Sequence, residues 1–165
     1  FTTGYEQDLQ ALGKIARDAG AYSLIDGYQG VGQVSLDLSE TGVDFYTGGP
    51  LKWLCGGPGL AYLYVRDELA RTLEPRITSW FAAEKQFDFD LENFEFRPDA
   101  RRFELGTPAL PTVHTALGGQ EVIDEVGFST VLERNTMLTD HLIGSASEAG
   151  FSLRLPEPDR SLYRY

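Results

Sequence analysis

The stretch that decides the fold is Ala21-Tyr22-Ser23-Leu24-Ile25-Asp26, an apolar run that ends in a carboxylate. Gly20 precedes this run, and apolar side chains recur at helical spacing between Leu9 and Ala19. A helix that stops at a glycine and leads into a continuous apolar run is typical of a layered α/β protein, in which helices cover both faces of each strand. We therefore expect a helix over residues 9–19 and then a buried parallel strand that ends at Asp26.

The rest of the chain continues this alternation. Short strands are expected over Val43–Thr47, Leu60–Val65 and Phe151–Leu155, and long helices over residues 108–126 and 128–149. Residues 74–102 interleave phenylalanines with acids and show no clean period, which indicates long loops. The pattern as a whole favours an α/β layered domain, with the strand at 151–155 opening a second one.

The composition excludes several classes of protein. The 165 residues are 42% hydrophobic, which is enough for a packed core and excludes global disorder. A net charge of −11 repels phosphate backbones, so a nucleic-acid partner is not expected. No apolar run approaches the length needed to span a bilayer, so a membrane partner is not expected either. The single cysteine, Cys55, suits a reducing cytoplasm, and with two histidines it leaves too few ligands for a structural zinc site.

A carboxylate and a lysine are expected at the same edge of the sheet. Asp26 ends the first strand and Lys52 follows the next one, and ligands of open α/β sheets bind at this edge. Leu51 and Trp53 flank the lysine and are expected to reduce the hydration of its amine, which favours the neutral form that makes a Schiff base. Pyridoxal phosphate needs a lysine for its aldehyde and an acid for its pyridine nitrogen. A purely structural interpretation remains open, in which Asp26 caps a turn and Lys52 is a solvated loop charge.

The stretch from Asp26 to Val65 resembles the class V aminotransferase family of fold-type I pyridoxal-phosphate enzymes. The resemblance is carried by Asp26, Gln29, Gly32, Val43-Asp44-Phe45, Lys52 and Gly57-Pro58-Gly59-Leu60-Ala61-Tyr62-Leu63-Tyr64-Val65. Farther on, the chain is similar to the kynureninase branch at Ser79-Trp80-Phe81, Phe87-Asp88-Phe89 and Arg102-Phe103-Glu104-Leu105-Gly106-Thr107-Pro108-Ala109.

The resemblance implies a role for five residues. Asp26 would pair with the pyridine nitrogen of the cofactor, Gln29 would lie beside its ring oxygen, and Lys52 would form the Schiff base and shuttle a proton. Thr107, and with it Trp80, would reach the cofactor phosphate of the neighbouring subunit, which implies a homodimer with composite active sites. Ordinary aromatic packing of Trp80 and a helix N-cap at Thr107 remain open as alternatives.

The resemblance also implies the architecture. We expect part of the fold-type I fold, a mostly parallel sheet covered by helices, followed by the start of a small α+β C-terminal domain. Residues 1–110 would form the C-terminal part of the large cofactor-binding domain with its active-site loops, and residues 111–165 the connecting helices and the start of the small domain. The chain would thus be a piece of a longer protein that lacks N-terminal and C-terminal parts.

The reaction is left open among several members of the family. Kynureninase-like hydrolytic cleavage of an amino-acid side chain is the leading hypothesis, although kynureninases usually have an aromatic residue where this chain has Leu51 and a histidine where it has Gln29. Cysteine desulfurases share the glutamine but have a histidine before the lysine. Desulfuration, epimerisation and transamination are therefore alternatives, and a cofactor-free α/β interaction domain is an alternative from another class.

Overall fold

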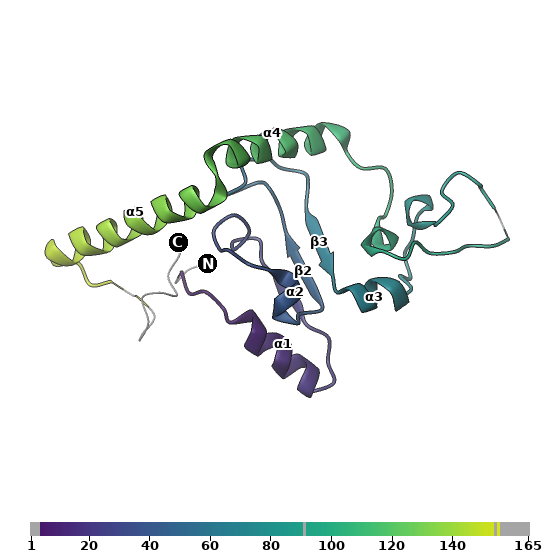
Figure 1. The fold of residues 1–165 in the computed structure, drawn as a ribbon, viewed down its shortest axis with the longest axis horizontal. Helices are drawn as coiled ribbons and strands as arrows, with labels where there is room; N and C mark the ends of the chain where they lie inside the picture. The colour runs from purple at the N-terminus through teal and green to yellow at the C-terminus, as the bar shows by residue number, and fades with distance from the viewer. Residues whose placement is uncertain (1–3, 91, 154, 156–165) are drawn as a thin grey trace.

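The computed structural model describes residues 4–90, 92–153 and 155, and its centre is a three-stranded sheet of order β1-β2-β3 (Figure 1). The strands are β1 (Leu24–Asp26), β2 (Phe45–Gly48) and β3 (Tyr62–Val65). β1 runs parallel to β2, with Asp26 opposite Thr47, and β3 runs antiparallel to β2. The three strands lie where the sequence predicts them, and within the described residues the sheet is mixed.

The three long helices also lie within two residues of their predicted positions. In chain order the helices are α1 (Leu9–Asp18), α2 (Leu38–Thr41), α3 (Asp67–Thr72), η1 (Trp80–Ala82), η2 (Ala100–Phe103), α4 (Leu110–Val126) and α5 (Phe128–Glu148). The side chain of Asp8 caps α1 by accepting a hydrogen bond from the Ala11 amide at 2.9 Å. None of these helices is both long and apolar enough to span a membrane.

The burial predicted for β1 is wrong. Leu24 is 67% exposed, and among the described residues β1 pairs only with β2, so it forms the edge of the sheet. A buried hydrophobic cluster lies at the opposite edge of the sheet, where Val65 at the end of β3 packs with Leu69 and Ala70 of α3. α5 contains no buried residue, and Figure 1 shows it extending away from the sheet.

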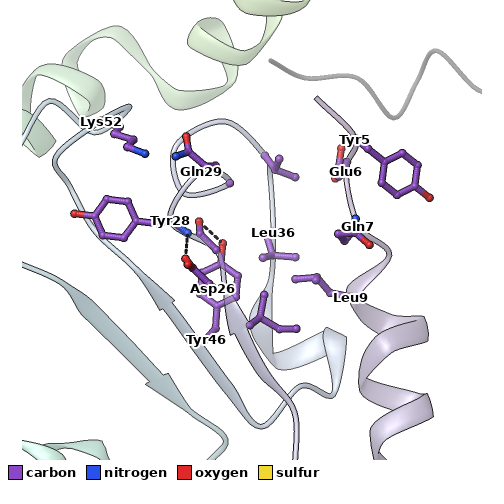
Figure 2. A pocket seen from close by; sticks show the side chains of 14 residues that line it. Tyr5, Glu6, Gln7, Leu9, Asp26, Tyr28, Gln29, Leu36, Tyr46 and Lys52 are labelled. Carbon is purple, nitrogen blue, oxygen red and sulfur yellow. Dashed lines mark hydrogen bonds between the residues drawn. The ribbon is translucent and has the colours of Figure 1, made fainter. Parts of the chain in front are cut away.

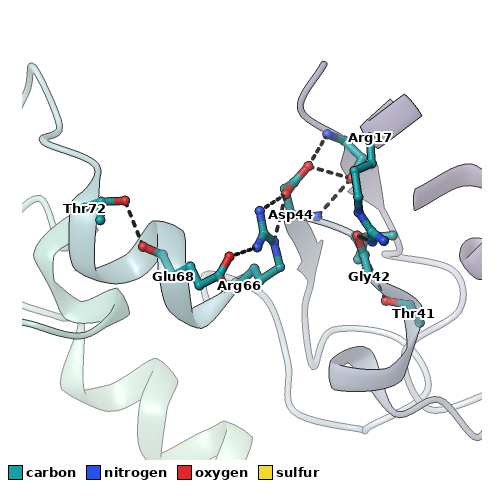
Figure 3. Close-up of polar contacts among 9 residues, drawn as sticks. Arg17, Thr41, Gly42, Asp44, Arg66, Glu68 and Thr72 are labelled. Carbon is teal, nitrogen blue, oxygen red and sulfur yellow. Dashed lines mark hydrogen bonds and ion pairs between the residues drawn. The ribbon is translucent and has the colours of Figure 1, made fainter. Parts of the chain in front are cut away.

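A half-buried ion pair ties the three strands together (Figure 3). The Asp44 carboxylate accepts hydrogen bonds from the amide of Ser23 at 2.8 Å and from its hydroxyl at 3.1 Å. It also accepts one from Nε of Arg66 at 3.0 Å, and Nη2 of Arg66 lies 2.9 Å from it. Burial raises the pKa of Asp44, but the hydrogen bonds from Ser23 and Arg66 and the charge of Arg66 outweigh it and hold the pKa below its usual value.

The predicted strand at 151–155 is wrong for the part of it that the structure describes. Residues 151–153 and 155 form no strand, and Arg154 lies outside the described residues. Gly150 has a positive φ of 81°, and the Phe151 amide donates to the Ala146 carbonyl at 3.0 Å. The chain therefore closes the end of α5 instead of pairing with a strand.

Candidate functional site

A cavity of about 500 Å³ opens at the carboxyl end of β1 (Figure 2). Its walls come from the start of α1 and the segment before it, the segment between the end of β1 and α2, β2, and the loop after β2. The lining residues are Tyr5, Glu6, Gln7, Leu9, Ile25, Asp26, Gly27, Tyr28, Gln29, Gly30, Val34, Leu36, Tyr46 and Lys52. Three of the predicted site residues, Asp26, Gln29 and Lys52, thus share one cavity.

Asp26 is held at the point where β1 becomes a turn. Its Oδ1 accepts a hydrogen bond from the Tyr28 amide at 3.1 Å. The Gly27 amide donates to the Thr47 carbonyl at 2.8 Å, and the Tyr46 hydroxyl donates to the Gly27 carbonyl at 3.1 Å. A Cβ at Gly27 would overlap the Tyr46 ring, so only glycine fits here. Asp26 thus caps the turn, as expected if its role were purely structural, but its side chain is also exposed and lines the cavity.

Lys52 lies in the turns that follow β2. Its Nζ is 5.4 Å from the centroid of the Tyr28 ring, and Figure 2 shows its side chain reaching toward the turn that carries Gln29. The expected dehydration of the amine by its neighbours is wrong: Lys52 is exposed, and Leu51 and Trp53 are themselves 42% and 40% exposed. The physical reason is that both flanking side chains lie at the surface of a turn, where neither covers the amine.

The sequence does not predict the wall of the cavity that is formed by the start of α1 and the segment before it. Tyr5, Glu6, Gln7 and Leu9 line it although no motif marks them. The signal that could have found them is topological. When a helix precedes a strand of a parallel pair, the segment leading into that helix lies at the carboxyl edge of the sheet, where ligands bind.

Trp80 and Thr107 do not line this cavity. Trp80 begins η1 and its ring packs against Phe81, Phe87 and Phe89, with centroid distances of 4.8, 5.8 and 6.1 Å. Thr107 is exposed and precedes α4. The N-cap interpretation of Thr107 is wrong, because α4 begins at Leu110 after Ala109 and has no side-chain cap.

The sequence matches known proteins along almost its whole length. The sequence profile described as "Aminotransferase class-V" matches residues 2–160. The chain belongs to this family. It is 35% identical over 153 residues to the uncharacterized aminotransferase YcbU of Bacillus subtilis, covering 93% of this chain and 40% of that protein. It is 28% identical over 144 residues to kynureninase of Pseudomonas fluorescens, covering 87% of this chain and 34% of the relative.

Solved structures of the family confirm the expected fold class. A cysteine desulfurase from Thermococcus onnurineus NA1 superposes with a TM-score of 0.77 at 25% identity, over 98% of this chain and 39% of that one. An alanine–glyoxylate aminotransferase from Nostoc superposes with a TM-score of 0.64 at 18% identity, over 93% of this chain and 40% of that one. This class V chain therefore spans 34–40% of the length of these relatives.

The residues of the cavity fit pyridoxal phosphate, which is the cofactor of the family. The amine of Lys52, the carboxylate of Asp26 and the amide of Gln29 line a single space, together with the polar side chains of Glu6 and Gln7. Apolar side chains supply a wall for a ring, from Ile25, Val34 and Leu36. The volume falls within the range of about 300–1,000 Å³ that is usual for sites of small ligands.

Proposed function

We propose that the full-length protein is a pyridoxal-phosphate-dependent enzyme acting on an amino acid, with Lys52 as the residue that attaches the cofactor. The observation that supports this most is the convergence of Lys52, Asp26 and Gln29 on one cavity at the carboxyl edge of the sheet. Asp26 ends β1, Gln29 lies in the turn after it, and Lys52 lies in the loop after β2. Their convergence requires both the parallel pairing of β1 with β2 and the turn after each strand.

Each of the three side chains has a distinct task in this proposal. When bound, the cofactor supplies an electron sink for negative charge that develops at the substrate Cα. The Asp26 carboxylate keeps the pyridine nitrogen protonated, and its hydrogen bond from the Tyr28 amide holds it in orientation. Gln29 donates or accepts a hydrogen bond at the ring oxygen, and the Lys52 amine moves the proton at Cα.

Spectroscopy of the full-length protein tests the attachment. Addition of pyridoxal phosphate to the wild type should produce a visible absorption band, and borohydride should fix the cofactor covalently to one tryptic peptide that contains Lys52. Lys52→Ala should lose both signals, whereas the control Lys85→Ala, which removes another exposed lysine, should keep them. A wild-type protein with no band would support the cofactor-free interaction domain, and labelling that persists in Lys52→Ala would overturn the proposal.

For the reaction we propose kynureninase-like hydrolytic cleavage of an amino-acid side chain. Several kynureninases support this, each 28–29% identical to the chain over at least 86% of its length. Transamination is the second candidate, because a relative described as an aminotransferase is 35% identical. Product analysis with kynurenine separates the two: release of anthranilate and alanine supports cleavage, and formation of a keto acid that depends on an amino acceptor supports transamination. Alanine and elemental sulfur from cysteine would indicate desulfuration, and racemisation would indicate an epimerase.

We further propose a cytoplasmic homodimer in which Thr107 and Trp80 act on the cofactor of the neighbouring subunit. Both residues lie outside the cavity of their own chain, and both are exposed. The proposed domain boundary after residue 110 falls at the start of α4, so residues 1–110 would carry the cofactor cavity and residues 111–165 would lead into a second domain.

A further inference from the structure

Trp53, the residue next to Lys52, is bonded to the turn that carries the other proposed cofactor residues. Its indole Nε1–H donates a hydrogen bond to the backbone carbonyl of Gln29 at 3.0 Å, across 24 residues of sequence. The lysine loop and the Asp26–Gln29 turn are therefore joined by a directed bond, in addition to sharing a cavity. Trp53 itself is 40% exposed, so burial of its ring explains only part of its placement.

Close approach of the two backbones supports the same connection. Gly32 has a positive φ of 83°, and a Cβ there would lie 2.9 Å from Cβ of Trp53 and 3.0 Å from Cδ2 of Leu54. Gly49 lies against the Tyr28 ring, since a Cβ there would lie 2.7 Å from the Tyr28 hydroxyl. Two glycines, one on each side, thus allow the loop and the turn to touch, and the indole bond sets how they are oriented.

We propose that Trp53 is a positioning residue for Lys52. Adjacent Cα atoms are about 3.8 Å apart, so a tryptophan whose side chain is tied to Gln29 restricts where the backbone of Lys52 can move. The bond thereby keeps Lys52 at the cavity that Asp26 and Gln29 also line. This inference rests on the proposed function, in which Lys52 attaches the cofactor.

The decisive comparison is between two substitutions at Trp53 in the full-length protein. Trp53→Phe keeps an aromatic ring but removes the N–H donor. Trp53→His keeps a five-membered ring that superposes on that of indole and places Nε2 where Nε1 of tryptophan lies. If the bond positions Lys52, the histidine variant should capture pyridoxal phosphate faster than the phenylalanine variant. A packing role predicts the opposite order, because phenylalanine is the larger and more apolar side chain.

The readout is the rate at which the apo protein captures pyridoxal phosphate, followed by the growth of its visible band. Capture joins the Lys52 amine to the cofactor aldehyde with release of one water. A single hydrogen bond is worth at most about a factor of ten, so capture by Trp53→Phe should slow by about three- to tenfold. Trp53→His should recover part of that loss. Rates are compared well below the melting temperature of each variant, so that only folded protein is measured.

Ser147→Ala is the matched control. It also removes one exposed bond from a side chain to a backbone carbonyl, here from the Ser147 hydroxyl to Ile143 at 2.8 Å, but it lies in α5. Capture by this variant should equal that of the wild type. The inference would be overturned if Trp53→Phe captured the cofactor at the wild-type rate, or faster than Trp53→His does. Either result would leave the proposed function standing. Labelling that persists in Lys52→Ala would instead overturn the proposed function, so the two failures are distinguishable.

Discussion

Replacement of Asp44 by asparagine should destabilise the protein without changing any residue that lines the cavity at the end of β1. The carboxylate side chain is only 10% exposed and accepts hydrogen bonds from Ser23 and Arg66. An asparagine at this position would have the same shape but no charge, and its amide nitrogen cannot accept the bonds that one carboxylate oxygen accepts now. The half-buried guanidinium of Arg66 would lose its pairing with a charged partner beside β2.

The size of the effect follows from these contacts. A hydrogen bond to a charged group contributes about 1.5–3 kcal/mol to stability. The Arg66 side chain is 34% exposed, and water screens part of its pairing with Asp44. We therefore expect a loss of about 2 kcal/mol of unfolding free energy, which is a change of about 30-fold in the ratio of folded to unfolded protein.

The effect should disappear in acid. The folded-state pKa of Asp44 lies below its usual value, so the stabilisation is complete above the usual carboxyl pKa and is lost as pH falls through the lower folded value. The difference between wild type and Asp44→Asn should be constant between about pH 7 and 5 and should shrink below about pH 4. Urea unfolding of the full-length proteins at several pH values measures it.

Asp37→Asn is the control for this experiment. The pKa of Asp37 is also lowered, by hydrogen bonds from Ser39, but Asp37 is exposed and caps α2, where asparagine serves equally well. Its substitution should lower the urea midpoint at pH 7 less than Asp44→Asn does, because Asp37 is exposed and water screens its charge. A difference between wild type and Asp44→Asn that is absent at pH 7, or that grows as pH falls, would refute the reasoning.

Three further predictions concern other parts of the chain. Gly118→Ala should stabilise α4 by about 0.5–1 kcal/mol, because no atom lies where the added Cβ would go. Gly119→Ala should destabilise the protein, since its Cβ would lie 2.7 Å from the backbone carbonyl carbon of Cys55. Thermal unfolding compares the two variants. Asp26→Asn should keep the melting temperature but lower kcat by orders of magnitude, and the reverse result would make Asp26 a structural cap. When Lys52→Ala and Thr107→Ala subunits are mixed, heterodimers should regain activity, because one of their two sites keeps both residues. No recovery after subunit exchange would show that the sites are not shared.

The secondary structure could be predicted because its signals are local. Apolar spacing and a terminal glycine place α1 and the turn after it, and short apolar runs place the strands. Burial could not be predicted in the same way, because it depends on what covers an element. Leu24 belongs to an apolar run but is exposed, since β1 pairs on one side only within the described chain. Residues 151–153 are apolar enough for a strand, but the backbone bond from Phe151 to Ala146 closes a helix.

The site could be predicted only as far as topology brings strand ends together. Asp26 ends one strand of a parallel pair and Lys52 follows the other, so their meeting at one edge is a consequence of the pairing. The contacts that orient these two side chains do not follow from the strand pairing. Gly27, Gly32 and Gly49 allow close approach of the backbone to another segment, and no local pattern in the sequence identifies which segment that is.

In the folded chain these three glycines meet Tyr46, Trp53 and Tyr28, respectively. Each contact joins one of the two loops at the cavity to the other loop or to the sheet. The same loops could satisfy every local preference with the amine of Lys52 turned away from the cavity, since an exposed lysine is equally stable in water. The contacts around Lys52 therefore decide whether its side chain is held at the cavity or is free in solvent. Among these contacts, the hydrogen bond from the Trp53 indole to the Gln29 carbonyl is the one that fixes an orientation.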